Sequence, residues 1–181
     1  MSAIDDLLRD KKAVLTDRWV ERTIETYPAE SRSFFSRQKN RFANPVGRTL
    51  AEGLAATFDA LLAEADAAEL CRCLEEIIKI RAVQEFTPSG AVVFAMLLKD
   101  VIREELQDEL DQPQIARELL DFERRIDQLA LFAFDLFVRS REKMYQLRAN
   151  EVERRVSTLI KRSGFFLDES DGDAQPDKDA R

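Results

Sequence analysis

Fifty consecutive residues, from Gln114 to Ser163, contain neither glycine nor proline. These two residue types interrupt helices most strongly, so the run allows a helix far longer than the usual length of about 11 residues. An alternation of spacings of four and three, typical of the buried stripe of a helix, is formed by Ile115, Leu119, Phe122, Ile126 and Leu129. The run is predicted to form one very long helix or two helices with an unmarked joint.

The rest of the chain also favours helices. Only five Gly and five Pro occur in 181 residues, and 45% of the residues are hydrophobic, so an all-α fold is predicted. We expect one domain over residues 1–166 and a disordered acidic tail over 167–181. From Asp168 onward the tail carries six acids against two basic residues, which accounts for most of the formal charge of -7.

Helix starts are marked by capping residues. A capping box at Ser2 and Asp5 opens a predicted first helix that ends by Pro28. After a connector with Phe34, Phe35 and Phe42, later starts are predicted at Asn44–Pro45, at Asp66 with Glu69, and at Thr87–Pro88. For the last of these helices the expected core positions are Val92, Val93, Met96, Val101 and Leu106.

The stretch RAVQEFTPSGAVVF, residues 81–94, raises the question of whether it is a binding loop or a seam between two helices. Thr87 is a good N-cap and Pro88 suits the first position of a helix, which favours the seam. The polar residues Arg81, Gln84, Thr87 and Ser89 nevertheless form a dense cluster. With Asp127 and Asp135 as partners of Arg81, they are the candidate signalling seam.

The segment LALFAFDLFV, residues 129–138, is apolar on nearly every side. Such a helix must be covered all round, and in a domain of this size one face would meet a second subunit. We therefore predict a homodimer whose face includes Leu129, Phe132, Phe134, Leu136 and Phe137. From Arg139 to Arg162, eight basic residues against three acids indicate a solvated face or a helix that docks a partner.

Much chemistry is missing from the sequence. The chain has no histidine, which removes Ser-His-Asp and Cys-His pairs, His-bound zinc and the usual haem ligand. Cys71 and Cys73 are two helical steps apart, roughly 200° around the axis, so their thiols should point to opposite faces of a helix. We expect no enzyme activity, no cofactor and no metal. The acidic balance argues against nucleic acid as a partner, and the absence of a signal peptide or long apolar run predicts a cytoplasmic protein without a membrane span.

Four segments together resemble one family: NPVG at 44, RAVQEFTPSGAV at 81, RRIDQLALFAFDLF at 124 and REKMYQLRANE at 141. They resemble the N-terminal domain of the RsbT co-antagonist proteins, the RsbR-like sensors of bacterial stress signalling, over most of residues 15–155. The resemblance implies a globin-like helical domain without haem that pairs as a dimer. In such sensors a long helix leads into a phosphorylatable STAS domain. Here a short acidic tail follows Phe166, so we do not carry over that output.

The expected function is that of a stand-alone sensory and regulatory domain. A signal or protein partner would bias the packing of the long C-terminal helices in the dimer. Equally, the polar seam could serve only to fix helix register. The alternative function is a globin-type pocket, lined by some of the 12 phenylalanines, that binds a small apolar ligand such as a fatty acid.

Overall fold

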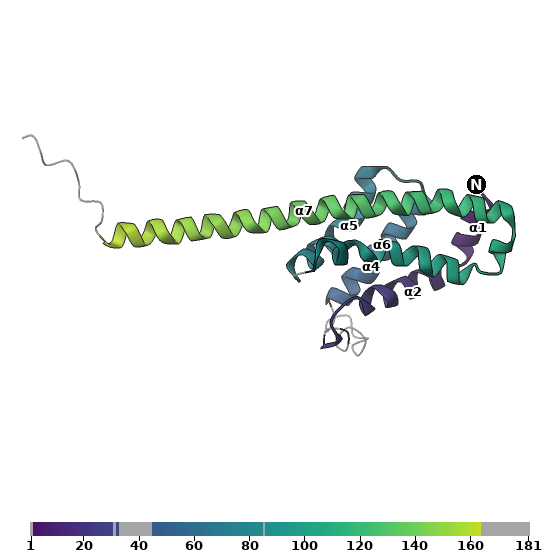
Figure 1. Ribbon diagram of the computed structural model, residues 1–181, viewed down its shortest axis with the longest axis horizontal. Helices are drawn as coiled ribbons and strands as arrows, with labels where there is room; N and C mark the ends of the chain where they lie inside the picture. The colour runs from purple at the N-terminus through teal and green to yellow at the C-terminus, as the bar shows by residue number, and fades with distance from the viewer. Residues whose placement is uncertain (1, 31, 33–44, 85, 164–181) are drawn as a thin grey trace, which may run out of the picture. The chain divides into compact units, whose positions relative to one another are not determined.

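A computed structural model describes residues 2–30, 32, 45–84 and 86–163. No strand occurs in these ranges. The helices are α1 (Ala3–Asp10), α2 (Lys12–Glu25), α4 (Pro45–Leu62), α5 (Ala67–Val83), α6 (Pro88–Glu105) and α7 (Pro113–Ser163), with a short 3-10 helix η1 (Glu109–Asp111) before α7 (Figure 1). The predicted all-α fold with a long C-terminal helix is confirmed. The chain divides into two compact units, Met1–Arg141 and Glu142–Arg181.

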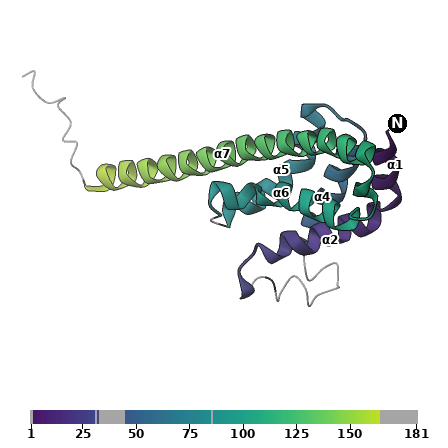
Figure 2. The same ribbon diagram turned by 45° about the vertical axis from the view of Figure 1, so that its right-hand side comes forward.

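The first unit is a bundle in which α4 packs against α5 and α2, and α2 packs against α6 (Figure 2). The first part of α7 joins this bundle through contacts with several helices. The rings of Phe122 on α7 and Phe58 on α4 meet edge to face, with centroids 6.4 Å apart. Arg141 Nη1 donates to the carbonyl of Ala82 on α5 at 3.1 Å. The inward face of α7 is therefore held against α4 at Phe122, and the helix is tied to α5 at Arg141.

Three predicted helix starts are confirmed by their hydrogen bonds. Ser2 caps α1 in a full capping box with Asp5. The Asp66 carboxylate accepts from the third backbone N–H of α5 at 2.9 Å, and the Thr87 hydroxyl does the same for α6 at 3.1 Å. Each side chain satisfies a backbone donor that has no partner within its own helix. These starts are local features, which is why sequence alone identifies them.

The two proline positions also agree with the prediction. Pro45 and Pro88 are the first residues of α4 and α6. The predicted cap Asn44 and the phenylalanines of the preceding connector, Phe34, Phe35 and Phe42, lie outside the described residues.

The predicted first helix is two helices, which corrects the sequence interpretation. The backbone leaves helical geometry at Lys11, with φ -92° and ψ 5°, so α1 ends and α2 begins there. The Lys11 ammonium donates to the Glu105 carbonyl at 2.7 Å and pairs with Glu109 at 2.9 Å. These partners lie about 100 residues away in the chain, and tertiary contacts of this kind override local helix propensity.

The core face of α6 also differs from the prediction. Val92 and Val93 are half-buried and Met96 is 37% exposed, although Val101 and Leu106 are buried as predicted. The structure instead buries Ala91, Phe94, Ala95 and Leu98. The cause lies on α2, where Trp19 Nε1 donates to the Phe94 carbonyl at 2.7 Å and the two rings stack with centroids 6.2 Å apart. This contact sets the rotation of α6.

Helix α7 is a single helix, the first of the two predicted alternatives. Within the first unit its predicted stripe is buried, and the buried series runs on through Ala133 and Phe137. The members of this inner stripe are Ile115, Leu119, Phe122, Ile126, Leu129, Ala133 and Phe137.

The second unit is described as far as Ser163 and consists there of the C-terminal part of α7. From 142 to 162 all side chains except Met144 and Glu151 are exposed. Glu151 accepts from Arg154 at 2.7 Å and from Arg155 at 2.8 Å, one turn along the helix. The domain boundary expected at 166 and the acidic tail 167–181 lie outside the described residues. None of the described helices has both the length and the apolar character that crossing a bilayer requires.

Candidate functional site

The predicted dimer face divides between the inside and the outside of the bundle. Leu129 and Phe137 are 0% and 2% exposed, so both belong to the core and are removed from the face. They lie eight residues apart and share the inward side of α7, because about two helical turns separate them. Phe134 is 42% exposed, and Phe132 and Leu136 are half-buried. These three remain candidates for contact with a second subunit.

The outward side of α7 carries apolar residues that the sequence prediction left out. Leu131 is 66% exposed, and Val138 is half-buried one heptad further on. With Phe134 between them, they follow helical spacing and form an outer patch of Leu131, Phe134 and Val138. Single exposed apolar residues are common on protein surfaces, but a contiguous row of them indicates an interaction site.

Arg81 is wholly buried where α5 meets the end of α2 and the start of α6. Its Nη1 donates to the Gly90 carbonyl at 2.9 Å, and its Nη2 donates to the Thr26 hydroxyl, also at 2.9 Å. Longer contacts reach the carbonyls of Ala91 and Thr23, at 3.5 and 3.4 Å. One side chain therefore joins three helices.

Three aromatic rings surround the same guanidinium. Its Cζ atom lies 5.0 Å from the ring centroid of Tyr27, 4.8 Å from that of Phe86 and 5.3 Å from that of Phe94. The faces of such rings attract a cation, most strongly where water is excluded. The three rings and the carbonyl dipoles thus compensate part of the cost of burying the charge. We refer to Arg81, Thr26, Tyr27, Phe86 and Phe94 as the Arg81 cluster.

Burial shifts both ionisable groups of the Arg81 cluster toward their neutral forms. It lowers the pKa of Arg81, and the neighbouring Tyr27 partly opposes that shift. It raises the pKa of Tyr27, against the influence of the Arg81 charge. A guanidinium does not lose its proton in proteins, so Arg81 stays charged despite that shift, and burial keeps the Tyr27 hydroxyl in its neutral form. The Arg81 cluster is therefore a fixed charge in the core.

The other residues of the candidate seam lie elsewhere. Gln84, Thr87 and Ser89 are exposed around the α5–α6 connection, where the Thr87 and Ser89 hydroxyls are 3.4 Å apart. Asp127 is exposed and accepts from Lys99 on α6 at 2.5 Å, and Asp135 is exposed on α7. Neither aspartate pairs with Arg81, which corrects the predicted Arg–Asp contact. Ile126 of the inner stripe is next to Asp127, and Ala133 and Phe137 lie two residues to either side of Asp135, so helical geometry turns both aspartates outward.

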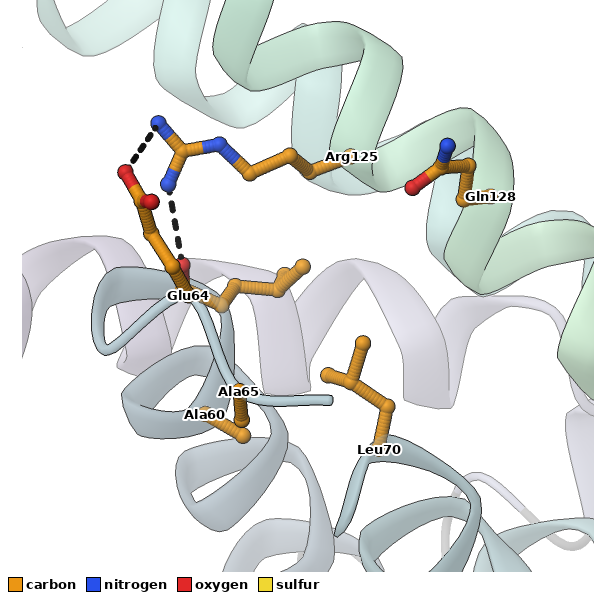
Figure 3. A pocket seen from close by; sticks show the side chains of 7 residues that line it. Ala60, Glu64, Ala65, Leu70, Arg125 and Gln128 are labelled. Atoms are coloured by element: carbon orange, nitrogen blue, oxygen red, sulfur yellow. Dashed lines mark hydrogen bonds and ion pairs between the residues drawn. The ribbon is translucent and has the colours of Figure 1, made fainter. Parts of the chain in front are cut away.

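Arg125, which the sequence prediction did not single out, lines a small cavity beside the turn after α4 (Figure 3). Its guanidinium donates to the Leu61 carbonyl at 3.2 Å and lies 3.3 Å from the Glu64 carboxylate. The cavity volume is about 170 Å³, below the range of about 300–1,000 Å³ that is usual for small-molecule sites. It is too small for a fatty acid.

A larger, open surface cavity of about 720 Å³ lies between α2 and α4, and none of its lining residues is buried. Its size suits a small molecule, but the carboxylates of Asp17, Glu21 and Glu52 line it beside Val20 and two alanines. Three acidic groups oppose the carboxylate of a fatty acid by like-charge repulsion. Neither of these two cavities therefore favours the predicted fatty-acid ligand.

Groups of metal-binding side chains are not found in the part of the chain that the structure describes. Cys71 and Cys73 are both free and half-buried. Burial, with Glu69 as the next cause, raises the pKa of Cys73, so this thiol is a weaker nucleophile at neutral pH than an ordinary cysteine.

Comparison with known proteins identifies the family of this chain. The model of the family described as "RsbT co-antagonist protein rsbRD N-terminal domain" matches residues 13–152, well over half of the chain. The chain belongs to this family, and the resemblance stated from the sequence is confirmed. No curated protein and no solved structure gives a significant match. The globin-like character of the fold stays a prediction.

Proposed function

We propose that this member of the RsbT co-antagonist family is a non-enzymatic sensory and regulatory domain that acts as a homodimer and through contact with a protein partner. The RsbR-like resemblance refers to bacterial stress signalling, and the proposal accordingly places the chain in the bacterial cytoplasm. The observation that carries the proposal is the outer patch, where Leu131 and Phe134 are 66% and 42% exposed on a helix whose opposite side is buried.

The outer patch suits a second copy of the chain. Exposing large apolar side chains to water is unfavourable. Burying the patches of two copies against each other would stabilise the dimer by roughly 25 cal/mol for each Å² of apolar surface covered. Phe132 and Leu136 are half-buried on the flank of the same segment and would extend the covered area. Symmetric pairing of one patch with itself is the commonest arrangement of homo-oligomers.

The Arg81 cluster supplies a means of holding one arrangement of helices. Arg81 contacts α2 through Thr26 and α6 through Gly90, while its own backbone belongs to α5. A buried charge tolerates few alternative positions, because each lost contact leaves the charge without compensation. In our proposal, a signal molecule or a protein partner binds one arrangement of the helices more tightly than another. The equilibrium between the arrangements shifts only by that difference in affinity.

The outer patch is tested by one substitution on α7 and a matched one on α6. Phe134→Glu should weaken dimerisation about thirtyfold, because a buried aromatic contact of this kind is worth about 2 kcal/mol. Met96→Glu is the control, since Met96 is 37% exposed against 42% for Phe134 but lies on another helix. Sedimentation velocity over a range of concentrations would measure both variants, with circular dichroism confirming that each is folded. A wild-type chain that stays monomeric at every concentration contradicts the proposal.

The regulatory role needs a test of its own. The family's description names its members co-antagonists of RsbT, so a purified RsbT-type protein is the first partner to try. Calorimetric titration with the wild-type chain and with Phe134→Glu should show tighter binding to the wild type, because we propose that the dimer is the form that partners recognise. Equal binding by both variants would separate partner contact from dimerisation and contradict that part of the proposal.

A further inference from the structure

The C-terminal part of α7 carries an apolar series of its own. Its spacings alternate between four and three, and its members are Tyr145, Ala149, Val152, Val156 and Leu159. Val152, Val156 and Leu159 are 59%, 47% and 64% exposed. A 4–3 series keeps one narrow stripe on a helix, and that stripe is characteristic of helices that pair as coiled coils.

The spacing assigns each residue a place in a seven-residue repeat with positions a to g. Ala149 and Val156 take position a, and Tyr145, Val152 and Leu159 take position d. A β-branched residue at a with leucine at d, as in Val156 and Leu159, favours two strands over three or four. Position g, which flanks the stripe, is arginine in every repeat: Arg141, Arg148, Arg155 and Arg162.

These flanking charges select the direction of pairing. In a parallel pair each g residue faces the e residue five positions further along its partner, which brings Arg148 to Glu153. In an antiparallel pair g faces g, which brings arginine to arginine. Arg155 is engaged with Glu151 of its own helix. Among the residues that the structure describes, neither Arg148 nor Glu153 forms an ion pair, so both are available to a partner.

We propose that residues 145–159 of two copies form a parallel, in-register, two-stranded coiled coil. This inference rests on the proposed function, because it requires the homodimer. The inference adds that a second copy of the same helix covers the exposed stripe, and it specifies the direction and the register in which the two helices pair. The coil begins at Tyr145, because the preceding a position is Glu142, where the carboxylates of the two copies would meet and repel each other.

Cysteine cross-linking tests direction and register. In a background with Cys71→Ser and Cys73→Ser, the variants Ala149→Cys and Leu159→Cys should each form a disulfide-linked dimer under mild oxidation, since both stripe positions face their own copies in a parallel pair. Leu147→Cys is the matched control. Leu147 is 60% exposed but occupies position f on the outer side of the coil, so its dimer yield should stay at background.

The possible results separate this inference from the proposed function. Disulfides only in a mixture of Ala149→Cys with Leu159→Cys would show antiparallel pairing and overturn the inference. A dimer in sedimentation in which neither cysteine variant cross-links above the Leu147→Cys control overturns the coiled coil but leaves the homodimer in place. A chain that is monomeric at every concentration overturns both.

Charge exchange tests the predicted contact between copies. Arg148→Glu should weaken dimerisation about tenfold, because it turns two symmetric attractive pairs into repulsive ones. The double variant Arg148→Glu/Glu153→Arg should restore the wild-type dissociation constant, since each glutamate again faces an arginine. Equal weakening by the single and double variants would overturn the assigned register.

Discussion

The two parts of α7 have the same secondary structure and opposite surroundings. From Pro113 to Arg141 the helix contributes its inner stripe to the bundle of the first unit, and Phe122, Ile126 and Leu129 have no exposed surface. From Glu142 to Arg162 nearly every described side chain is exposed. An unbroken helix can therefore be buried along one part and exposed along another. Burial depends on which faces of the helix contact neighbouring helices.

The position of the apolar stripe differs between the two parts as well. The second series runs through Tyr145, Ala149, Val152, Val156 and Leu159. At about 100° a residue, its average direction lies about 115° around the helix from that of the inner stripe. The second series is thus not a continuation of the core stripe, and it needs a partner of its own. The comparison between a covered and an uncovered half gives four predictions.

The largest effect is expected from deleting a core ring in the covered half. Phe122→Ala should lower the free energy of unfolding by about 3–5 kcal/mol, because it removes a fully buried ring and leaves a cavity. Val152→Ala, in the uncovered half, should change the stability of the first unit by less than about 0.5 kcal/mol. Urea unfolding followed by circular dichroism, at concentrations low enough to keep both variants monomeric, would measure the two. Similar losses would mean that the halves do not differ as the structure indicates.

Arg81 tests how much a buried charge stabilises the bundle of helices against which the covered half of α7 packs. Arg81→Ala should cost about 3 kcal/mol, because three ring contacts and the hydrogen bonds to α2 and α6 are lost together. Arg81→Lys should cost less, since it keeps the charge but not the planar fork of donors. The same urea experiment measures both. If Arg81→Lys is no more stable than Arg81→Ala, the stabilisation comes from the planar arrangement of guanidinium donors and not from the positive charge.

An ion pair in each half gives a smaller contrast. Arg103 on α6 holds Glu123 on α7 through two contacts, of 2.6 and 2.7 Å, and the Glu123 side chain is only 9% exposed. Glu123→Gln should cost about 1–2 kcal/mol. Glu151→Gln, in the uncovered half, breaks exposed pairs on one helix and should cost no more than about 0.5 kcal/mol. Thermal unfolding at low and high salt would distinguish them, because salt screens the exposed pairs more strongly.

The smallest effect concerns pH at the start of α1. Burial alone would raise the pKa of Asp5, but hydrogen bonds from Ser2 outweigh it and, with Arg125 and Arg9, leave that pKa below its ordinary value. A carboxylate with a depressed folded pKa stabilises the protein above its unfolded pKa and loses that contribution as pH falls through the folded value. Asp5→Ala should cost about 1 kcal/mol at neutral pH.

The acid dependence provides the check on Asp5. The stability difference between the wild type and Asp5→Ala should shrink between about pH 5 and pH 2, where the carboxylate takes up its proton. Urea midpoints collected across that range would show it. A difference that grows on acidification would contradict the assigned sign.

Local features were predictable from the sequence, and contacts between helices were not. Ser2, Asp66 and Thr87 cap helices through residues three positions away, so their roles follow from short motifs. The break at Lys11 depends on Glu105 and Glu109 instead. No local pattern reports that contact.

The candidate site shows the same limit. Arg81, which the sequence analysis singles out, is the buried centre of its cluster, but its predicted aspartate partners were wrong, because the rotation of α7 turns Asp127 toward solvent and Lys99. The second apolar series was visible in the sequence and was missed. Eight basic residues between Arg139 and Arg162 dominate that segment, and a stripe built from alanine and valine is less conspicuous than one of leucine.

The contact between Trp19 and Phe94 gives this protein a built-in optical reporter. The chain has a single tryptophan, and that indole is fully buried, with its N–H bound to the Phe94 carbonyl. Phe94 also forms one wall around Arg81. A rearrangement that separates α2 from α6 would expose the indole to water and shift its fluorescence emission to longer wavelength. A conformational response of this kind can therefore be followed by tryptophan emission, without attaching a dye.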